Sequence, residues 1–151
     1  MKGYNLNKAN YIKCNENLNI IKIYDIKNLE SYKIHIEQLI EWFNGEYVWD
    51  KMFNINDVFD RINNGHILFL LFYNNTAVGY VFFKPLNSVD CFGYNLYVTK
   101  KIDRPKNLAE LFYNKVSGII LSDYENIKVE VEDWNSVVFK IIENIGYQKN
   151  I

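Results

Sequence analysis

A polar corner between two apolar segments is the part of this sequence best suited to chemistry. The strand-like YNLYV (94–98) ends shortly before it, and the helix-like LAELFYNKVSGIIL (108–121) begins directly after it. The corner contains, in order, Arg104, Pro105, Lys106 and Asn107. The first N–H groups of a helix are unpaired and lie at the positive end of its dipole, so this arrangement suits a phosphate group. A polar loop between a strand and a helix is more often only a loop, and the corner alone leaves both interpretations open.

Two carboxylates in KVEVE (128–132) are the next candidates. Glu130 and Glu132 alternate with Val129 and Val131, as on a strand with one buried face. A carboxylate in a half-buried cleft can accept the proton of an amine. The alternative is that both glutamates only line the solvated face of the strand.

The cysteines and histidines do not indicate a metal site. Cys14 and Cys91 lie far apart and show no metal-ligand or CxxC spacing, and His35 and His66 form no pair at ligand spacing. We expect free thiols in a reducing cytoplasm, and histidines that are structural or lie on the surface.

Length and composition favour one packed domain over residues 1–151. Of the 151 residues, 49% are apolar and 17% aromatic, without a repeat or a linker. A net charge of −1 gives no general attraction for nucleic acid or an acidic membrane. No apolar run approaches the roughly 18 residues of a membrane span, and the N-terminus lacks the apolar core of a secretory signal. We therefore expect a cytoplasmic protein that binds neither nucleic acid nor membrane.

Apolar periodicity predicts the elements before the corner. The strand-like segments 10–14 and 19–26 flank a turn-like NENLN and predict an N-terminal hairpin, or one strand with a lead-in. A helix capped by Asn28 should follow, and then a loop over 44–53.

A second helix should begin after Asn54 or Asn56 and end near Gly65. Its buried residues should be Val58, Phe59 and Ile62. Three strands should come next, at 66–73, 77–84 and 89–98.

After the corner we expect a helix, a strand over 126–132, and a last helix from 135 that ends at Gly146. The helix at the corner should place six residues along one side, namely Leu108, Leu111, Phe112, Lys115, Val116 and Ile119. This order predicts an α/β (α+β) fold with a mixed, mostly antiparallel sheet, a parallel strand–helix–strand crossover and helices on both faces. Ligands collect at the carboxyl ends of strands in such sheets, which is where the corner lies.

Two motifs resemble those of the GNAT (general amine N-acetyltransferase) superfamily. LYVTKKIDRPKNLAELF resembles its acetyl-CoA pyrophosphate signature, a strand followed by Q/R-x-x-G-x-G/A at a helix start. VEVEDWNSVVFKIIENIGY resembles its second signature, and NNTAVGYVFF resembles its central hairpin. The matching positions are Arg104, Asn107 and Ala109 in the first motif, and Asn135, Val138, Gly146 and Tyr147 in the second.

The resemblance implies a GNAT-like fold that uses acetyl-CoA as co-substrate and no metal. The pyrophosphate would bind the loop formed by Arg104, Pro105, Lys106, Asn107, Leu108 and Ala109. The backbone of Tyr97 and Val98 would bond the pantetheine arm and polarise the acetyl carbonyl, and Asn135 would also bond the cofactor. Glu130, at the place of a strand glutamate in relatives that acetylate ribosomal proteins, would be the base.

The sequence also departs from the motifs. Asn107 replaces a glycine, and Pro105 removes one N–H donor. Ile142 stands where the family has the tyrosine that acts as general acid. Other tyrosines could replace that acid, among them Tyr94, Tyr97 and Tyr147.

These features support an N-acetyltransferase acting on a primary amine of a peptide, a protein or a small molecule. The alternative is a catalytically impaired GNAT-fold protein that senses CoA or serves as an interaction module. A third possibility is a mixed α/β domain whose corner binds no phosphate.

Two expectations concern the surroundings of the site. The aromatic residues Phe43, Tyr47, Trp49 and Phe53 could line an acceptor pocket, although packing onto the core or a second subunit is the favoured interpretation. A strand near 147–151 should be left unpaired at the sheet edge, which would favour a homodimer.

Overall fold

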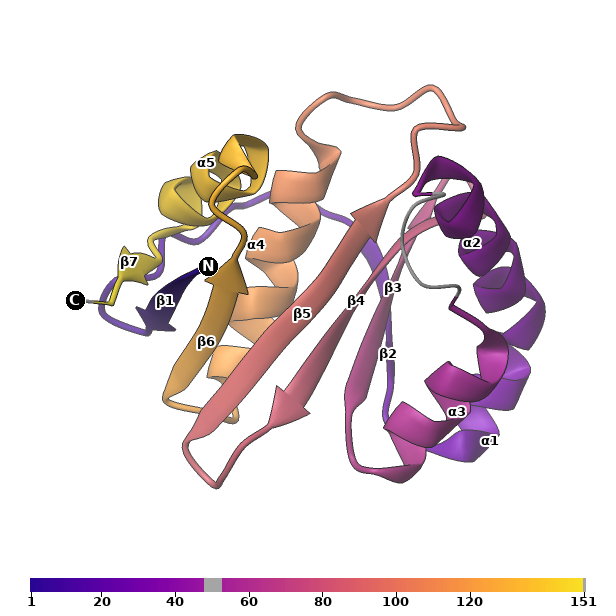
Figure 1. The fold of residues 1–151 in the computed structure, drawn as a ribbon, viewed down its shortest axis with the longest axis horizontal. Coiled ribbons are helices and arrows are strands. Elements are labelled where there is room, and N and C mark those ends of the chain that lie inside the picture. The colour runs from indigo at the N-terminus through magenta and orange to yellow at the C-terminus, as the bar shows by residue number, and fades with distance from the viewer. Residues whose placement is uncertain (48–52, 151) are drawn as a thin grey trace. The chain divides into compact units, whose positions relative to one another are not determined.

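The computed structural model describes residues 1–47 and 53–150 as a mixed α/β fold (Figure 1). Its strands are β1 (Lys2–Asn7), β2 (Asn19–Ile23), β3 (Ile67–Tyr73), β4 (Thr76–Pro85), β5 (Asp90–Val98), β6 (Asn126–Val131) and β7 (Gln148–Lys149). Its helices are α1 (Ile26–Ser31), α2 (Lys33–Glu46), α3 (Ile55–Asn63), α4 (Leu108–Leu121) and α5 (Ser136–Ile145).

The described strands are hydrogen-bonded in the order β2-β3-β4-β5-β6-β1-β7. The chain divides into two compact units, and β4 and β5 contribute to both. Unit 1 comprises residues 1–17, 83–94 and those from 106 onward, whereas unit 2 comprises 18–82 and 95–105. The β5–β6 pair is parallel, whereas the pairs β1–β6, β1–β7 and β2–β3 are antiparallel, so the predicted mixed sheet with a parallel crossover is confirmed.

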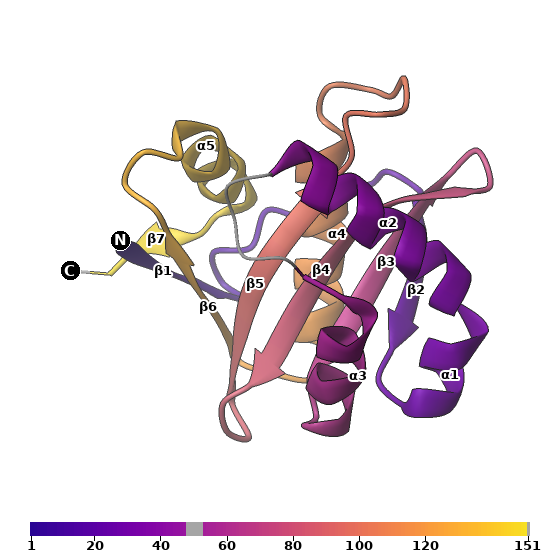
Figure 2. The same cartoon turned by 45° about the vertical axis from the view of Figure 1, so that its right-hand side comes forward.

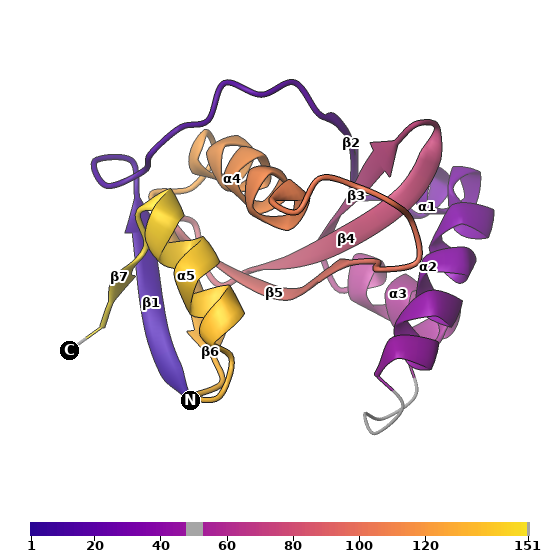
Figure 3. The same cartoon turned by 90° about the horizontal axis from the view of Figure 1, so that it is seen from above.

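Unit 2 is built around β3, whose sequence ILFLLFY is buried along most of its length. Because β3 is apolar on both faces it can lie inside the sheet, between β2 and β4, as its sequence predicts. Asn74 and Asn75 take positive φ angles of 50° and 65° and turn the chain tightly into β4. Helices α1, α2 and α3 lie along one face of these strands (Figure 3).

Of the two alternatives for the N-terminal segments, the hairpin is wrong and the single strand with a lead-in is confirmed. β2 pairs with β3, from Asn19↔Phe72 to Ile23↔Leu68, and residues 11–14 form no strand. The N-terminal strand is instead β1, in which only Tyr4 and Leu6 turn apolar side chains into the core.

The first helix begins earlier than predicted. Asp25, not Asn28, caps α1, and its carboxylate accepts the Asn28 N–H at 2.8 Å. Tyr32 then separates α1 from α2, and α2 extends to Glu46, so the first residues of the predicted loop are helical.

The prediction for α3 was better because its start is marked locally. The Asn54 side chain accepts the Asp57 N–H at 3.1 Å, and Asp57 accepts the Asn54 N–H at 2.9 Å, which completes a capping box. Val58 and Ile62 are buried as expected, whereas Phe59 is only half-buried.

Unit 1 contains the strands β6, β1 and β7, which lie side by side (Figure 2). β1 pairs with β6 from Lys2↔Val131 to Asn7↔Asn126. It also pairs with β7 through Tyr4↔Lys149. β7 is the last strand of the described order, as predicted for an edge strand near 147–151, and its outer side pairs with no described strand.

Helices α4 and α5 complete unit 1. The Phe139 ring of α5 packs on Tyr4 of β1, with ring centres 5.6 Å apart. Of the residues predicted along one side of α4, Phe112 and Val116 are buried, whereas Ile119 is 37% exposed. Gly146 ends α5 at a φ of +113°, as predicted.

Inside unit 1 the buried amide of Asn114 holds the segment that follows β1. Its Oδ1 accepts Tyr11 Oη at 2.9 Å and Cys14 N at 3.1 Å, and its Nδ2 donates to Ile12 O at 2.8 Å. Cys14 and Cys91 are both free thiols, as predicted. Across the described residues, no helix combines the length and apolarity needed to cross a membrane.

Candidate functional site

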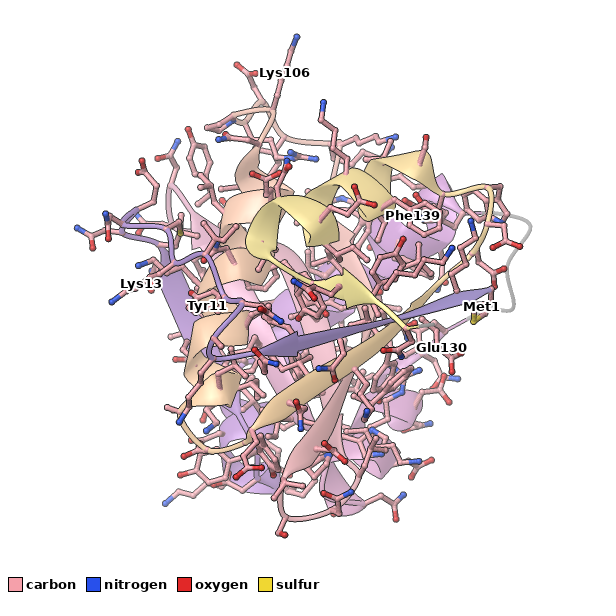
Figure 4. The ribbon with its side chains drawn as sticks, turned by 90° about the vertical axis from the view of Figure 1, so that its left-hand side faces the viewer. Met1, Tyr11, Lys13, Lys106, Glu130 and Phe139 are labelled. Atoms are coloured by element: carbon pink, nitrogen blue, oxygen red, sulfur yellow. The ribbon has the colours of Figure 1, made fainter. Side chains whose placement is uncertain are left out.

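The predicted phosphate corner leads into a helix start that carries no side-chain cap. Asn107 lies at the N-cap position of α4 with φ −94° and ψ 14°, so it is not left-handed, and its side chain makes no capping bond. The side chains of Asp25, Asn54 and Asn135, in contrast, each cap the helix that follows them. Lys106 projects outward from this start (Figure 4). The first N–H groups of α4 therefore stay available to an anion.

Arg104 braces the loop before the helix. Its Nε donates to Thr99 O at 2.8 Å, and its Nη1 donates to Pro105 O at 3.3 Å. A guanidinium carries five N–H donors, so several of them remain for an anionic ligand.

The carboxyl end of β5 is shaped by a change in its pairing. The parallel register with β6 runs from Asp90↔Asn126 to Phe92↔Lys128, although β5 continues to Val98. Asn95, inside β5, takes a φ of +54°, which is unusual for a strand residue and changes the direction of the backbone locally.

β4 approaches the same end of β5 closely. The Thr99 N–H donates to Val78 O at 2.8 Å. Because backbone groups alternate in direction along an antiparallel strand, we expect Val98 to turn its N–H and C=O away from β4. Gly79 permits this approach, since a Cβ at that position would lie 2.7 Å from Tyr97 O.

Asn135 caps α5 and keeps a free donor. Its Oδ1 accepts the Val138 N–H at 3.3 Å. Its Nδ2 has no hydrogen-bond acceptor among the described residues, so it can donate to a carbonyl of a ligand.

Glu130 is exposed on β6, opposite Gly3 of β1 (Figure 4). Val129 and Val131 are buried, and Glu132 is exposed just after the strand. This alternation fits the solvated-face interpretation, and the role of Glu130 as base stays a prediction.

The tyrosines suggested as replacement acids have different surroundings. Ile142, at the family's tyrosine position, is 1% exposed. Tyr147 is buried, with its Oη hydrogen-bonded to Ser117 Oγ at 3.0 Å, and burial raises its pKa well above the usual range. Tyr94 is half-buried.

Tyr97 is hydrogen-bonded to Glu46, a residue that the sequence analysis did not identify as a candidate. Its Oη donates to Oε2 of Glu46, at the end of α2. The same oxygen accepts Thr99 Oγ1 at 3.1 Å, and Oε1 accepts the Lys100 N–H at 3.1 Å. Burial, and then the bond to Glu46, raise the pKa of Tyr97 above its usual range.

Aromatic rings surround this contact in unit 2. The Tyr97 ring centre lies 5.3 Å from that of Phe43, 6.2 Å from that of Tyr47 and 5.3 Å from that of Tyr80. Phe53 joins through Phe43 at 6.2 Å, so packing accounts for three of the four aromatic residues singled out in the sequence. Trp49 lies outside the described residues.

The candidate residues are divided between the two units. Unit 2 contains Glu46, Tyr97, Val98, Arg104 and Pro105. Unit 1 contains Lys106, Asn107, Leu108, Ala109, Glu130 and Asn135.

Comparison with known proteins gives structural matches alone. No protein-family model matches the chain, and no curated protein matches it. Among solved structures, the chain is similar to a probable acetyltransferase, with a TM-score of 0.69 and 13% identity over 88% of this chain and 91% of that one.

Two further matches carry more specific descriptions. One is a putative GNAT-family acetyltransferase from Novosphingobium aromaticivorans, with a TM-score of 0.67 and 8% identity over 98% of this chain and 59% of that one. The other is the aminoglycoside acetyltransferase meta-AAC0020 from an uncultured soil metagenomic sample, in complex with sisomicin, with a TM-score of 0.59 and 16% identity over 85% and 86%. At these identities the likeness shows a shared fold.

Proposed function

Because this chain has the fold of the GNAT acetyltransferases, we propose that it is an acetyl-CoA-dependent N-acetyltransferase. It moves an acetyl group to a primary amine of a peptide, a protein or a small molecule. The observation that carries the proposal is the uncapped start of α4, which follows the basic corner of Arg104 and Lys106. Such a start is able to bind the pyrophosphate of CoA.

The residues around this corner fit the co-substrate. The N–H groups at the start of α4 and the Lys106 ammonium would hold the pyrophosphate, and Arg104 would keep the loop in place while offering its remaining donors. The outward-turned backbone of Val98 and the Nδ2 of Asn135 would bond the amide groups of the pantetheine arm. Pro105 has no backbone N–H, so the N–H donors for the pyrophosphate must come from the other residues of this loop.

The acceptor class is part of the proposal. The matched meta-AAC0020 acts on aminoglycosides, which carry several amines, and this supports a small-molecule amine as acceptor. Amines of peptides and proteins also stay candidate acceptors. A cytoplasmic location stays part of the proposal. A homodimer stays a proposal, supported by the position of β7 at the edge of the described strand order, where its outer side could pair with a second copy.

The buried Ile142 favours a second candidate function. It leaves no phenol at the family's acid position, as would suit a protein that binds CoA and no longer catalyses. Loss of a general acid lowers the rate by roughly 10²–10⁴-fold at most, so slow turnover and absent turnover must be separated by measurement.

Calorimetric titration with acetyl-CoA tests the proposal. Lys106→Glu should weaken binding about 5- to 30-fold, because it places a negative charge at the positive end of α4. Lys13→Glu, the same charge change at an exposed lysine distant from that start (Figure 4), should leave binding unchanged.

Release of the CoA thiol with a panel of primary amines then separates enzyme from sensor. Turnover supports the enzyme, whereas binding without turnover supports the sensor. Absence of acetyl-CoA binding at high micromolar concentration would refute both functions.

A further inference from the structure

Glu46 has an acceptor position to spare at the end of β5. A carboxylate offers about four acceptor positions, two on each oxygen. Among the described residues, Oε2 accepts two hydroxyl groups, those of Tyr97 and Thr99, whereas Oε1 accepts the Lys100 N–H alone, at 3.1 Å. One further N–H donor can therefore bond to Oε1 without displacing any bond already made.

Within the described part of the chain, this carboxylate forms hydrogen bonds and no ion pair. Its partners are two neutral hydroxyl groups and one backbone amide, and no described lysine or arginine forms an ion pair with it. Glu46 is only half-exposed, so its charge is screened less than that of a surface glutamate.

Tyr97 fixes which group is the donor and which is the acceptor. Its raised pKa keeps the phenol protonated through the pH range of ordinary enzymes. The phenol therefore donates to Glu46, and the carboxylate remains the group able to receive a proton.

Aromatic rings surround Tyr97, whose hydroxyl donates to this carboxylate. Tyr97 and Tyr47 have ring centres 6.2 Å apart, and Phe43 lies 5.0 Å from Tyr47 and 5.3 Å from Tyr97. Ammonium groups are attracted to aromatic faces within about 6 Å. Phe43 and Tyr47 are both partly exposed, so part of this wall is open to a ligand.

We propose that Glu46 is the acceptor-amine residue: its Oε1 binds the ammonium group of the acceptor and receives one of its protons. This inference rests on the proposed function and assigns the substrate side of the same site. It places the base in unit 2, on the residue bonded to the Tyr97 side chain. Val98, the next residue after Tyr97, is the one expected to turn its backbone away from β4.

The proton balance is complete without another reactant. The ammonium gives one proton to Glu46 and becomes a neutral amine, whose lone pair forms the C–N bond at the acetyl carbonyl. The C–S bond breaks, and its electron pair leaves on sulfur. The second N–H proton goes to that thiolate to give the CoA thiol, and Glu46 releases its proton to water.

The competing interpretation is that Glu46 only ties α2 to the end of β5. Both interpretations predict that removing the carboxylate disturbs the backbone around Lys100. Only the proposal predicts that the carboxylate responds to an ammonium ligand and ignores a neutral ligand of the same shape.

The first experiment is an NMR titration with benzylamine, in which benzyl alcohol is the neutral match. The reporter is the backbone amide of Lys100, which donates to Oε1. In the wild-type protein benzylamine should shift this signal and benzyl alcohol should not. Glu46→Gln should weaken benzylamine binding about 10- to 100-fold, the worth of a charge-assisted hydrogen bond.

Glu41→Gln is the matched control, since it makes the same change at an exposed glutamate of α2. It should bind benzylamine like the wild type. Equal binding by wild type and Glu46→Gln would overturn the proposal. If Glu46→Gln unfolds, Glu46→Asp keeps the charge and must retain measurable binding.

Turnover gives the second test, on any amine that the wild type acetylates. Glu46→Ala should lose about 10²–10⁴-fold in kcat/KM, and added formate should restore part of it, which a purely structural role would not allow. If Glu130→Gln abolishes turnover while Glu46→Gln keeps it, the base is Glu130 and the proposal fails. Absence of acetyl-CoA binding would refute the proposed function, while the benzylamine titration would still decide whether Glu46 binds an ammonium.

Discussion

Gly79→Ala is the sharpest test of how β4 and β5 meet. The added Cβ would lie 2.7 Å from Tyr97 O and 3.0 Å from Val98 Cγ2. An ordinary carbon–oxygen contact is about 3.3 Å, so the strands must separate by roughly 0.6 Å. Overpacking of this kind costs about 1–3 kcal/mol. For a chain of this size that corresponds to a melting temperature lower by about 2–12 °C, and acetyl-CoA binding should weaken because Tyr97 and Val98 move.

Gly45→Ala is the matched control. Gly45 is an exposed residue of α2, and an added Cβ there meets nothing within 4 Å. Alanine is the better helix former by about 0.5–1 kcal/mol, so this variant should melt at the same temperature or slightly higher. Thermal unfolding followed by circular dichroism measures both variants. If Gly79→Ala were as stable as Gly45→Ala and bound acetyl-CoA equally well, the close approach of the two strands would be wrong.

Three further measurements test other parts of the fold. Asn54→Ala removes the capping box of α3 and should lower the free energy of unfolding by about 0.5–2 kcal/mol in a urea titration; an unchanged midpoint would contradict the capping role. Burial raises the pKa of Tyr147 above its ordinary 10.0, so above pH 10 the unfolded chain releases a proton that the folded chain keeps. Stability should therefore fall as pH rises, and Tyr147→Phe should reduce that slope by about 1.4 kcal/mol per pH unit. Burial also raises the pKa of the Cys91 thiol to about 12, so a thiol reagent at pH 8 should modify Cys14 alone until urea is added; prompt modification of both would contradict the buried position.

The elements predicted well from the sequence are those whose signals are local. β3 is a continuous apolar run, Asn54 precedes an amphipathic helix, and Gly146 follows the last turn of α5. β1 was missed because it contributes only Tyr4 and Leu6 to the core. Its pairing with β6, more than a hundred residues away, makes it a strand.

In the candidate site, too, the residues with local sequence signals were found and those defined by long-range contacts were missed. The corner around Lys106 was found because a strand, a polar loop and a helix follow one another in the sequence. Glu46 was missed because its partners Tyr97, Thr99 and Lys100 lie 51 to 54 residues further along the chain. It also stands at the end of an ordinary amphipathic helix, where a glutamate attracts no notice.

The pairing of β1 with β6 has a consequence for synthesis on the ribosome. β1 ends at Asn7, and its partner strand is complete only at Val131. At roughly 5–20 residues per second, β1 waits about 6–25 s for that partner. Unit 2 needs no residue beyond 105, so its strands can assemble while the N-terminal segment is still unpaired. Translation pauses after residue 105 should therefore leave β1 open to protease while β3 is already protected.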